Sequence, residues 1–177
     1  MFISKLTLSL IAAFSLALTL SAETNLLQNP GFEDGMSFWT EKDDGLSKIS
    51  KEAAYAGKNG IRVTDNTKDT GSSLYSQEFP AKQGDEFYVS FWASIVDGPR
   101  ESVGVYIQYL DDYGTLLTTR ETGLTFVAVV KGTIGSWEQY DLSAIAPENT
   151  AFVRLWVHSW NAVEVVADFD EFEFYQK

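Results

Sequence analysis

Hydrophobic and polar residues alternate with a period of two over many short stretches, which is the pattern of β-strands with one buried face. These segments are rich in β-branched and aromatic residues and are bounded by Gly, Pro, Asn or Asp. They cover residues 60–65, 73–79, 85–95, 102–110, 114–120, 124–130, 136–142, 151–160 and 163–175. No window of helical periodicity competes with them. The succession predicts an all-β fold, a β-sandwich jelly roll of two antiparallel sheets.

Two stretches between or before these segments are predicted as turn or loop. Residues 111–114 (DDYG) form a tight turn, in which the glycine supplies a backbone conformation of positive φ. Residues 40–56 are polar and charged, and we expect a long loop with one short strand. Loops of that length are often functional.

The segment FVRLWVHSW, residues 152–160, is the most informative in the chain. Strand alternation places Val153, Leu155 and Val157 on one face, which belongs to the core. The other face carries Phe152, Arg154, Trp156, His158 and Trp160. Two indoles, a cation and the only histidine of the chain are costly to expose unless a ligand stacks on them. The segment is therefore a candidate ligand-binding strand.

Two other strands divide in the same way. In residues 85–95 the buried set leaves Tyr88 and Trp92 on the opposite face, and in residues 102–110 it leaves Tyr106 and Gln108. If the three strands are neighbours in one sheet, their outer face is an aromatic trough. Its floor consists of Tyr88, Trp92, Tyr106, Trp156 and Trp160, and its rim of Gln108, Arg154 and His158.

Flat rings beside hydrogen-bonding groups suit a sugar chain, because pyranose rings offer C–H faces to aromatic rings and hydroxyls at their edges. The alternative is that a loop covers this face and the rings form a second, minor core. The alternative applies most to Trp92, because a central tryptophan often packs under a loop. Arg154 can orient a sugar hydroxyl or a uronate carboxylate, or it can pair with an acidic residue.

His158 has no second histidine beside it, so a histidine metal site or a Ser-His-Asp triad lacks support. A hydrogen-bonding role and a packed neutral ring remain open. Trp39 and Trp137 lie near strand beginnings and are predicted to anchor core or loops.

The first residues read as a secretory signal peptide. Lys5 precedes an uncharged apolar run from Leu6 to Leu20, and Ser21 and Ala22 offer small residues at a cleavage site. A single membrane helix is the alternative, but the run is shorter than the roughly 20 residues that a span requires. We expect residues 1–22 to be the signal peptide and residues 23–177 to be one domain, secreted or periplasmic in a bacterium and not held at a membrane after cleavage.

The formal net charge is −12, from 25 acidic and 13 basic residues. Without a basic stripe or a basic amphipathic helix, nucleic acids and anionic membranes are poor partners. Neutral ligands or cations suit the chain better. It has no cysteine, so an exported domain of this kind is stabilised without disulfides.

Four motifs carry a resemblance to a known family. Residues 25–39 (NLLQNPGFEDGMSFW), 54–63 (AYAGKNGIRV), 88–94 (YVSFWAS) and 169–174 (FDEFEF) resemble carbohydrate-binding modules of families 4, 9, 16 and 22, in order and spacing. The resemblance implies a non-catalytic β-sandwich with one structural calcium ion. It also implies a sugar site on the concave sheet or at the loop edge.

The resemblance further implies ligands for that calcium ion. By position these are Glu33, Asp170, the carbonyl of Gly31 and the backbone around Lys58, with Asp168 as a competitor of Asp170. Hard oxygen ligands suit calcium, and an ion that ties both termini would replace the absent disulfides. The alternatives are a surface carboxylate for Glu33 and a plain strand-end charge for Asp170.

Three functions compete. The first is a secreted protein that binds a β-glucan, a xylan or a related polysaccharide, alone or beside a separate carbohydrate-active enzyme. The second is a small jelly-roll glycosidase or lyase, but a glycosidase needs two carboxylates roughly 5 to 9.5 Å apart, and the outward positions of the three strands carry none in their middles. A lyase would use His158 as a base and Arg154 to neutralise the carboxylate of a uronate.

The third function is that of a structural or adhesive protein with a covered aromatic face.

Overall fold

A computed structural model gives the fold of residues 24–119 and 122–177. The predicted signal peptide, residues 1–22, lies outside these described residues, as does Arg120 at the end of one predicted strand. The described part contains eleven β-strands and no helix. It therefore offers no helix long and apolar enough to cross a membrane.

The strands follow the predicted segments closely. They are β1 (Trp39–Glu41), β2 (Ser47–Ser50), β3 (Gly60–Asp65), β4 (Leu74–Ser76), β5 (Phe79–Pro80), β6 (Glu86–Asp97), β7 (Val103–Leu110), β8 (Phe126–Val129), β9 (Glu138–Ile145), β10 (Phe152–Ser159) and β11 (Val165–Gln176). The predicted strand 73–79 is divided into β4 and β5. Residues 40–56 begin with the end of β1 and contain the one expected short strand, β2.

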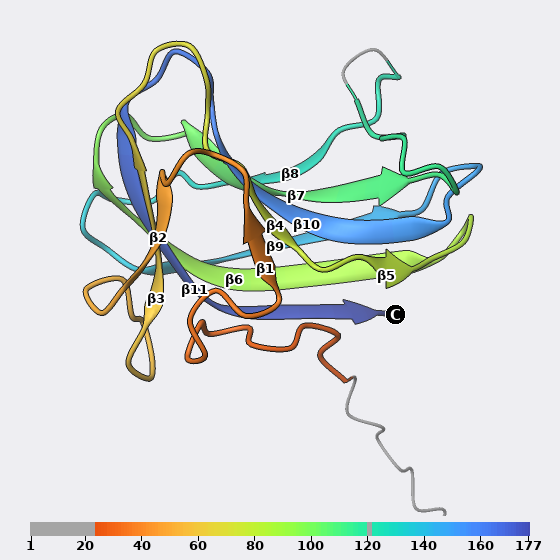
Figure 1. Cartoon of the computed structure of the whole chain (residues 1–177), viewed down its shortest axis with the longest axis horizontal. Helices are drawn as coiled ribbons and strands as arrows, with labels where there is room; N and C mark the ends of the chain where they lie inside the picture. Colours follow the sequence, from red (N-terminus) through yellow and green to blue (C-terminus); the bar gives the residue numbers. More distant parts are fainter. Residues whose placement is uncertain (1–23, 120–121) are drawn as a thin grey trace, which may run out of the picture.

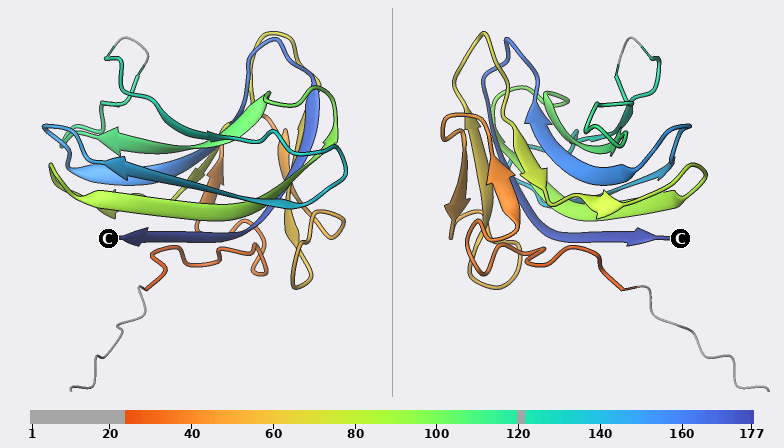
Figure 2. Two further views of the ribbon diagram at one scale, coloured as in Figure 1. Left: turned by 180° about the vertical axis from the view of Figure 1, so that it is seen from behind. Right: turned by 45° about the vertical axis from the view of Figure 1, so that its right-hand side comes forward.

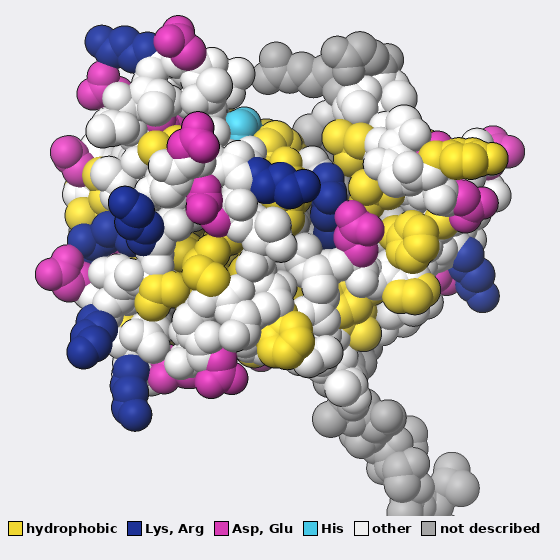
Figure 3. All heavy atoms as spheres, in the orientation of Figure 1, with side chains coloured by type: hydrophobic (Ala, Val, Ile, Leu, Met, Phe, Trp, Pro, Cys, Tyr) yellow, Lys and Arg dark blue, Asp and Glu magenta, His cyan; other side chains and the backbone are white. Residues whose placement is uncertain are grey.

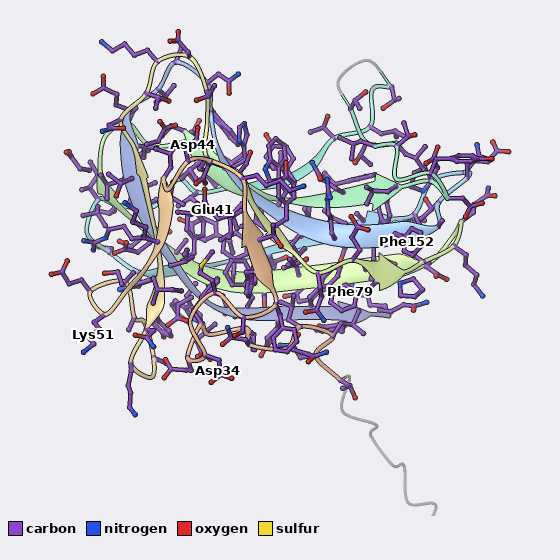
Figure 4. All side chains as sticks on the ribbon, in the orientation of Figure 1. Asp34, Glu41, Asp44, Lys51, Phe79 and Phe152 are labelled. Carbon is purple, nitrogen blue, oxygen red and sulfur yellow. The ribbon has the colours of Figure 1, made fainter. Side chains whose placement is uncertain are left out.

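The strands form two antiparallel sheets that face each other, so the predicted jelly-roll sandwich is confirmed (Figure 1). The first sheet has the order β1-β4-β10-β7-β8, with β5 paired to β10, and the second has the order β2-β3-β11-β6-β9. β10 and β7 are strongly curved, and their concave side faces away from the second sheet (Figure 2). Phe79 and Phe152 mark the end of the first sheet at which β5 meets β10 (Figure 4).

The core lies between the sheets and is formed by the inward faces that the alternation predicts. Val153, Leu155 and Val157 of β10 are completely buried, as are the alternate residues of β6 and β7. Phe172 of β11 closes one end of this core, where its ring lies 5.2 Å from that of Trp39. The predicted core role of Trp39 is thereby confirmed.

The predicted strand 114–120 is wrong for its described residues, which form only an isolated bridge between Leu116 and Leu110. Side chains compete there with the strand ladder for backbone N–H groups. Asp111 Oδ1 accepts the N–H groups of Tyr113 and Thr115 at 2.9 and 2.7 Å. The predicted tight turn is confirmed, with Gly114 at φ 78°.

Candidate functional site

A row of aromatic rings crosses the concave outer face of the first sheet. Strand register places Trp156 of β10 directly beside Tyr106 of β7 and Tyr75 of β4. The ring of Trp156 lies 4.9 Å from that of Tyr106 and 6.0 Å from that of Tyr75. The planes of Trp156 and Tyr75 are nearly parallel, at 4°. Neighbouring strands thus align three rings, because residues opposite one another on the same face must meet.

His158 and Trp160 extend this row along β10. The imidazole of His158 stacks on Trp156 at 4.0 Å and 20°. The residue opposite His158 on β7 is Gly104. Because Gly104 has no side chain, it leaves room for the ring of Trp160. A Cβ atom added to Gly104 would lie only 3.2 Å from that ring. The indole N–H of Trp160 donates to the carbonyl of Glu101.

The histidine is held in one tautomer. Its Nδ1 lies 2.6 Å from the carbonyl oxygen of Ser72 and therefore donates a proton to it. Burial lowers the pKa of His158, although this hydrogen bond opposes the shift. The lowered pKa favours the neutral ring, in which Nε2 is a hydrogen-bond acceptor. The sequence had left open a hydrogen-bonding role and a packed neutral ring, and His158 combines the two.

Arg154 and Gln108 form the polar end of the row. The Nε–H of Arg154 donates to Gln108 Oε1 at 3.0 Å, and its Nη1 pairs with Glu78 Oε1 at 3.0 Å. The guanidinium lies over the ring of Tyr75, 4.3 Å from the centroid. Gln108 itself is only 4% exposed, so it positions Arg154 more than it faces solvent.

Two hollows lie on this face, and together with the row of rings we call them the aromatic cleft. The larger hollow, of about 640 Å³, lies over β7, β8 and β10 and is lined by Tyr106, Gln108, Thr118, Thr125, Phe126, Val127, Trp156, His158 and Trp160 among others. The smaller, of about 260 Å³, lies over β1, β4 and β10 and is lined by Thr40, Lys42, Tyr75, Ser76, Gln77, Glu78 and Arg154. Figure 3 shows the histidine (cyan) beside hydrophobic side chains in a depression between two raised parts of the surface.

The expectation that Tyr88 and Trp92 belong to this surface is wrong. Both lie on β6, which pairs with β9 and β11 in the second sheet. Trp92 stacks on Tyr55 of the β2–β3 loop at 4.0 Å, as the alternative anticipated, and Trp137 packs against the same Tyr55. Tyr88 packs on Tyr175. Alternation identifies outward residues, but it does not tell which sheet a strand joins.

The cleft floor is fixed by a dipeptide that the sequence analysis missed, Ser72-Ser73. Ser73 Oγ accepts the indole N–H of Trp156 at 3.3 Å, while the Ser72 carbonyl binds His158. Two buried carboxylates hold the dipeptide, that of Asp43 directly and that of Asp65, at the end of β3, through Ser159. Asp43 Oδ2 accepts the N–H of Ser73 at 2.8 Å, and its loop lies between the labelled Glu41 and Asp44 in Figure 4.

The second anchor of the dipeptide is Ser159. Its Oγ accepts the N–H of Ser72 at 2.7 Å and donates to Asp65 Oδ2 at 2.6 Å. Burial by itself would raise the pKa of Asp43, the first anchor, but hydrogen bonds from Ser47 and Ser73 together lower it. Asp43 and Ser159 therefore each belong to a network of satisfied buried hydrogen bonds. Such networks hold the Ser72-Ser73 dipeptide rigid.

Replacing Ser159 by alanine is expected to lower the free energy of unfolding by about 1–3 kcal/mol, because the buried Asp65 carboxylate and the Ser72 N–H each lose a partner. Urea unfolding measures the change. Ser136→Ala is the matched control, since Ser136 is exposed and should change stability by less than about 0.5 kcal/mol. Equal unfolding midpoints for the two variants would contradict the role given to Ser159.

Tyr75 is a further cleft residue that the sequence analysis missed, although its signal was present. Leu74 and Ser76 are both buried, so alternation along LYS turns Tyr75 outward as it does Trp156. Ser72 and Ser73 carry no such local signal. Ser73 meets Trp156 across 83 positions of the chain, and only the fold brings them together.

The four residues implied as calcium ligands lie near one another and outside the two hollows. Glu33 Oε1 accepts the N–H groups of Lys58 and Asn59 at 2.7 and 2.9 Å, and these bonds lower the pKa of Glu33. Gly31 lies against Asp170, since a Cβ at that glycine would be 3.4 Å from Asp170 Oδ1. The N-terminal motif, the β2–β3 loop and β11 therefore meet at one place.

Asp170 is the buried member of this group. Its side chain is inaccessible, and burial raises its pKa to about 6 in spite of N–H donors that include those of Ala56 and Tyr55. Asp168, the competitor, is instead bound by Arg62 through two hydrogen bonds of 2.7 and 2.8 Å. No cluster of three or more His, Cys, Asp or Glu side chains suited to a metal occurs in residues 24–119 and 122–177, so an ion here would also need carbonyl oxygens.

The arrangement offers no pair of catalytic carboxylates in the described part of the cleft. Among the residues that line the two hollows, Glu78 is the single acidic residue, and it is bound to Arg154. The proton on His158 Nδ1 is committed to a carbonyl. The geometry favours binding through rings and hydrogen bonds.

Comparisons with known proteins agree with this geometry. A sequence profile of the carbohydrate binding domain family, types 4 and 9, matches residues 24–163. A search of curated protein sequences gives no significant match.

Solved structures with a similar fold are numerous, and we describe three. The xylan-binding domain CBM22-1 of Paenibacillus barcinonensis Xyn10C has 18% identity and a TM-score of 0.64, over 88% of this chain and 96% of that chain. TmCBM61 in complex with β-1,4-galactotriose has 21% identity and a TM-score of 0.56, over 87% and 99%. The CBM22-1–GH10 modules of Clostridium thermocellum Xyn10B with xylohexaose have 18% identity and a TM-score of 0.66, over 88% and 29%. At these identities the likeness shows the fold.

Proposed function

Because this chain belongs to the carbohydrate binding domain family of types 4 and 9, we propose that its aromatic cleft binds a polysaccharide without cleaving it. The observation that carries the proposal is the aligned row of Tyr75, Trp156 and Tyr106 on a concave, accessible face. Rings in a row can stack on successive sugar units of one chain. The surrounding polar groups can bind the hydroxyls at the ring edges.

The cleft spans the width of the first sheet, from β1 to β8. With strands about 4.8 Å apart, five strands extend over roughly 19 Å, which is long enough for several pyranose rings. We therefore favour the interior of a chain over its end as the bound part. A β-glucan, a xylan or a related polymer is the proposed ligand class, and the xylan-binding and xylohexaose-bound modules of similar fold support it.

Affinity electrophoresis tests the proposal directly. The mature protein should migrate more slowly in native gels that contain soluble xylan or mixed-linkage β-glucan than in gels without polysaccharide. Bovine serum albumin run in the same gels controls for viscosity. Unchanged mobility in every polysaccharide would contradict the proposal.

A non-catalytic role is part of the same proposal. A glycosidase requires two carboxylates across the cleft, and Glu78 is the single acidic residue among the described lining residues. Release of reducing sugars or of unsaturated products from xylan or β-glucan would overturn this part.

We also propose the implied structural calcium ion, held by Glu33, Asp170 and carbonyls near Gly31 and Lys58. These donors fit a calcium ion, because Asp170 is a buried carboxylate. None of the ion pairs among the described residues gives Asp170 a basic partner. Oxygen donors of this kind are those that calcium prefers. When bound, the ion would supply the missing positive charge and tie the N-terminal motif to β11.

Export through the signal peptide is the proposed route to the polysaccharide. The N-terminal pattern from Lys5 to Ala22 supports it, and a polysaccharide ligand is met outside the cytoplasm. Outside the cell the domain would hold its polymer alone or beside a separate carbohydrate-active enzyme.

A further inference from the structure

The smaller hollow of the aromatic cleft is basic, although the chain as a whole is strongly acidic. Lys42 and Arg154 line it together with one carboxylate, that of Glu78. The larger hollow is lined by no Lys, Arg, Asp or Glu among the described residues, and burial lowers the pKa of its histidine. In a protein of formal net charge −12, two cations at one end of a ligand cleft indicate a specific charge preference there.

Both cations converge on one aromatic ring. Arg154 Cζ lies 4.3 Å and Lys42 Nζ 5.7 Å from the centroid of Tyr75. Figure 3 shows basic side chains (dark blue) meeting near the centre of the face shown, with an acidic side chain (magenta) beside them. The two cations therefore lie over the Tyr75 ring, and a sugar unit in this hollow would meet a guanidinium and an ammonium group side by side.

Two carboxylates of the neighbouring loop, those of Glu41 and Asp43, are held by hydrogen bonds within the protein. Glu41 Oε1 accepts the N–H groups of Asp43 and Gly45, at 2.8 and 2.9 Å. Asp43 is buried, and its carboxylate binds Ser47 and Ser73. Neither residue lines the hollow, so Glu78 is the carboxylate that balances its charge.

We infer that the smaller hollow is a subsite for an acidic sugar, a uronate residue whose carboxylate binds Arg154 and Lys42. Its volume of about 260 Å³ suits one sugar unit. The inference rests on the proposed function and adds a ligand class to it, namely a polysaccharide that carries uronate units. Arg154 suits a carboxylate particularly well because its planar guanidinium can donate two parallel N–H groups.

Glu78 occupies the position that the ligand carboxylate would take. Its side chain is 45% exposed, whereas that of Arg154 is only 19% exposed. The arginine is fixed from behind by Gln108, at 3.0 Å, and remains in place when its outer partner is exchanged. A uronate that displaced Glu78 would replace one carboxylate–guanidinium pair by another, so the exchange costs little.

Isothermal titration calorimetry with matched ligands tests the inference. One pair is xylotetraose and a xylotetraose that bears one glucuronate, and the second pair is cellotetraose and its C6-oxidised form. The acidic member of the pair that binds should bind roughly three- to fivefold more tightly at low salt. Added salt should remove most of this difference.

Two variants with opposite expected effects sharpen the test. Glu78→Gln removes the competing carboxylate and should raise affinity for the acidic ligand about threefold, while Lys42→Met should lower it about threefold. The quantity that decides is the ratio of acidic to neutral affinity, which should rise with Glu78→Gln and fall with Lys42→Met. Lys131→Met, an exposed lysine that lines neither hollow, is the control and should leave this ratio unchanged.

The outcomes separate this inference from the proposed function. If the neutral ligand binds and the acidic one binds no more tightly, the acidic subsite is refuted and the proposed function stands. If Glu78→Gln weakens acidic binding, the displacement of Glu78 is refuted. If none of the four oligosaccharides binds, both the subsite and the function proposed for these polymers fail.

Discussion

Trp156→Ala is expected to weaken binding of a xylan or β-glucan oligosaccharide by about thirtyfold, which corresponds to about 2 kcal/mol. Trp156 lies at the centre of the row and contacts the rings of His158, Tyr106 and Tyr75 at 4.0, 4.9 and 6.0 Å. Its loss removes an indole that lines the larger hollow and contacts Tyr75 of the smaller one. Calorimetric titration of the purified variant measures the change.

Trp137→Ala is the matched control for this experiment. Trp137 packs against Tyr55 on the second sheet and lines neither hollow, so the same substitution there should leave the affinity within twofold of the wild type. Circular dichroism of both variants checks that each remains folded. Full affinity in a folded Trp156→Ala protein would refute the aromatic cleft as the binding site.

Calcium removal is expected to lower the melting temperature by roughly 5–11 °C. At a free calcium concentration one hundred times its Kd, binding adds about 2.7 kcal/mol to stability, and about 1 kcal/mol shifts Tm by 2–4 °C in a domain of this size. The physical reason is that Asp170 is buried without a basic partner among the described residues, while the ion would link β11 to the N-terminal motif. Differential scanning calorimetry with excess EGTA, and again after calcium is restored, measures the shift.

Two Glu→Gln variants identify the site of that effect. Glu33→Gln preserves an oxygen for the Lys58 and Asn59 N–H groups and should remove most of the calcium-dependent shift. Glu148→Gln changes an exposed carboxylate and should retain it. A wild-type melting temperature that is the same in EGTA and in calcium would refute the metal site.

The sequence predicted the strands of the sandwich well because each has a local pattern. Alternation in β6, β7 and β10 identified the buried faces, for example Val153, Leu155 and Val157 of β10. The failure at residues 114–120 has a local cause too. The side chains of Asp111 and Thr122 accept the N–H groups of Thr115 and Thr119, which a strand would pair with a neighbour.

The candidate site was predicted in part. Tyr106, Gln108, Arg154, Trp156, His158 and Trp160 do meet on one face, since β7 and β10 are adjacent. Tyr88 and Trp92 do not join them, because β6 pairs in the other sheet. Tyr75 takes a place in the row that the sequence analysis had not assigned to it.

The sequence by itself determined which side chains face outward and which fill the core, because a strand's alternation is a property of neighbouring residues. It also carried the family motifs at both ends of the domain. Only the tertiary structure decided which outward faces share a sheet, because strand pairing depends on contacts between distant segments. The clamp of Ser72-Ser73 on Trp156 and His158, and the two cations on Tyr75, exist only once those segments have come together.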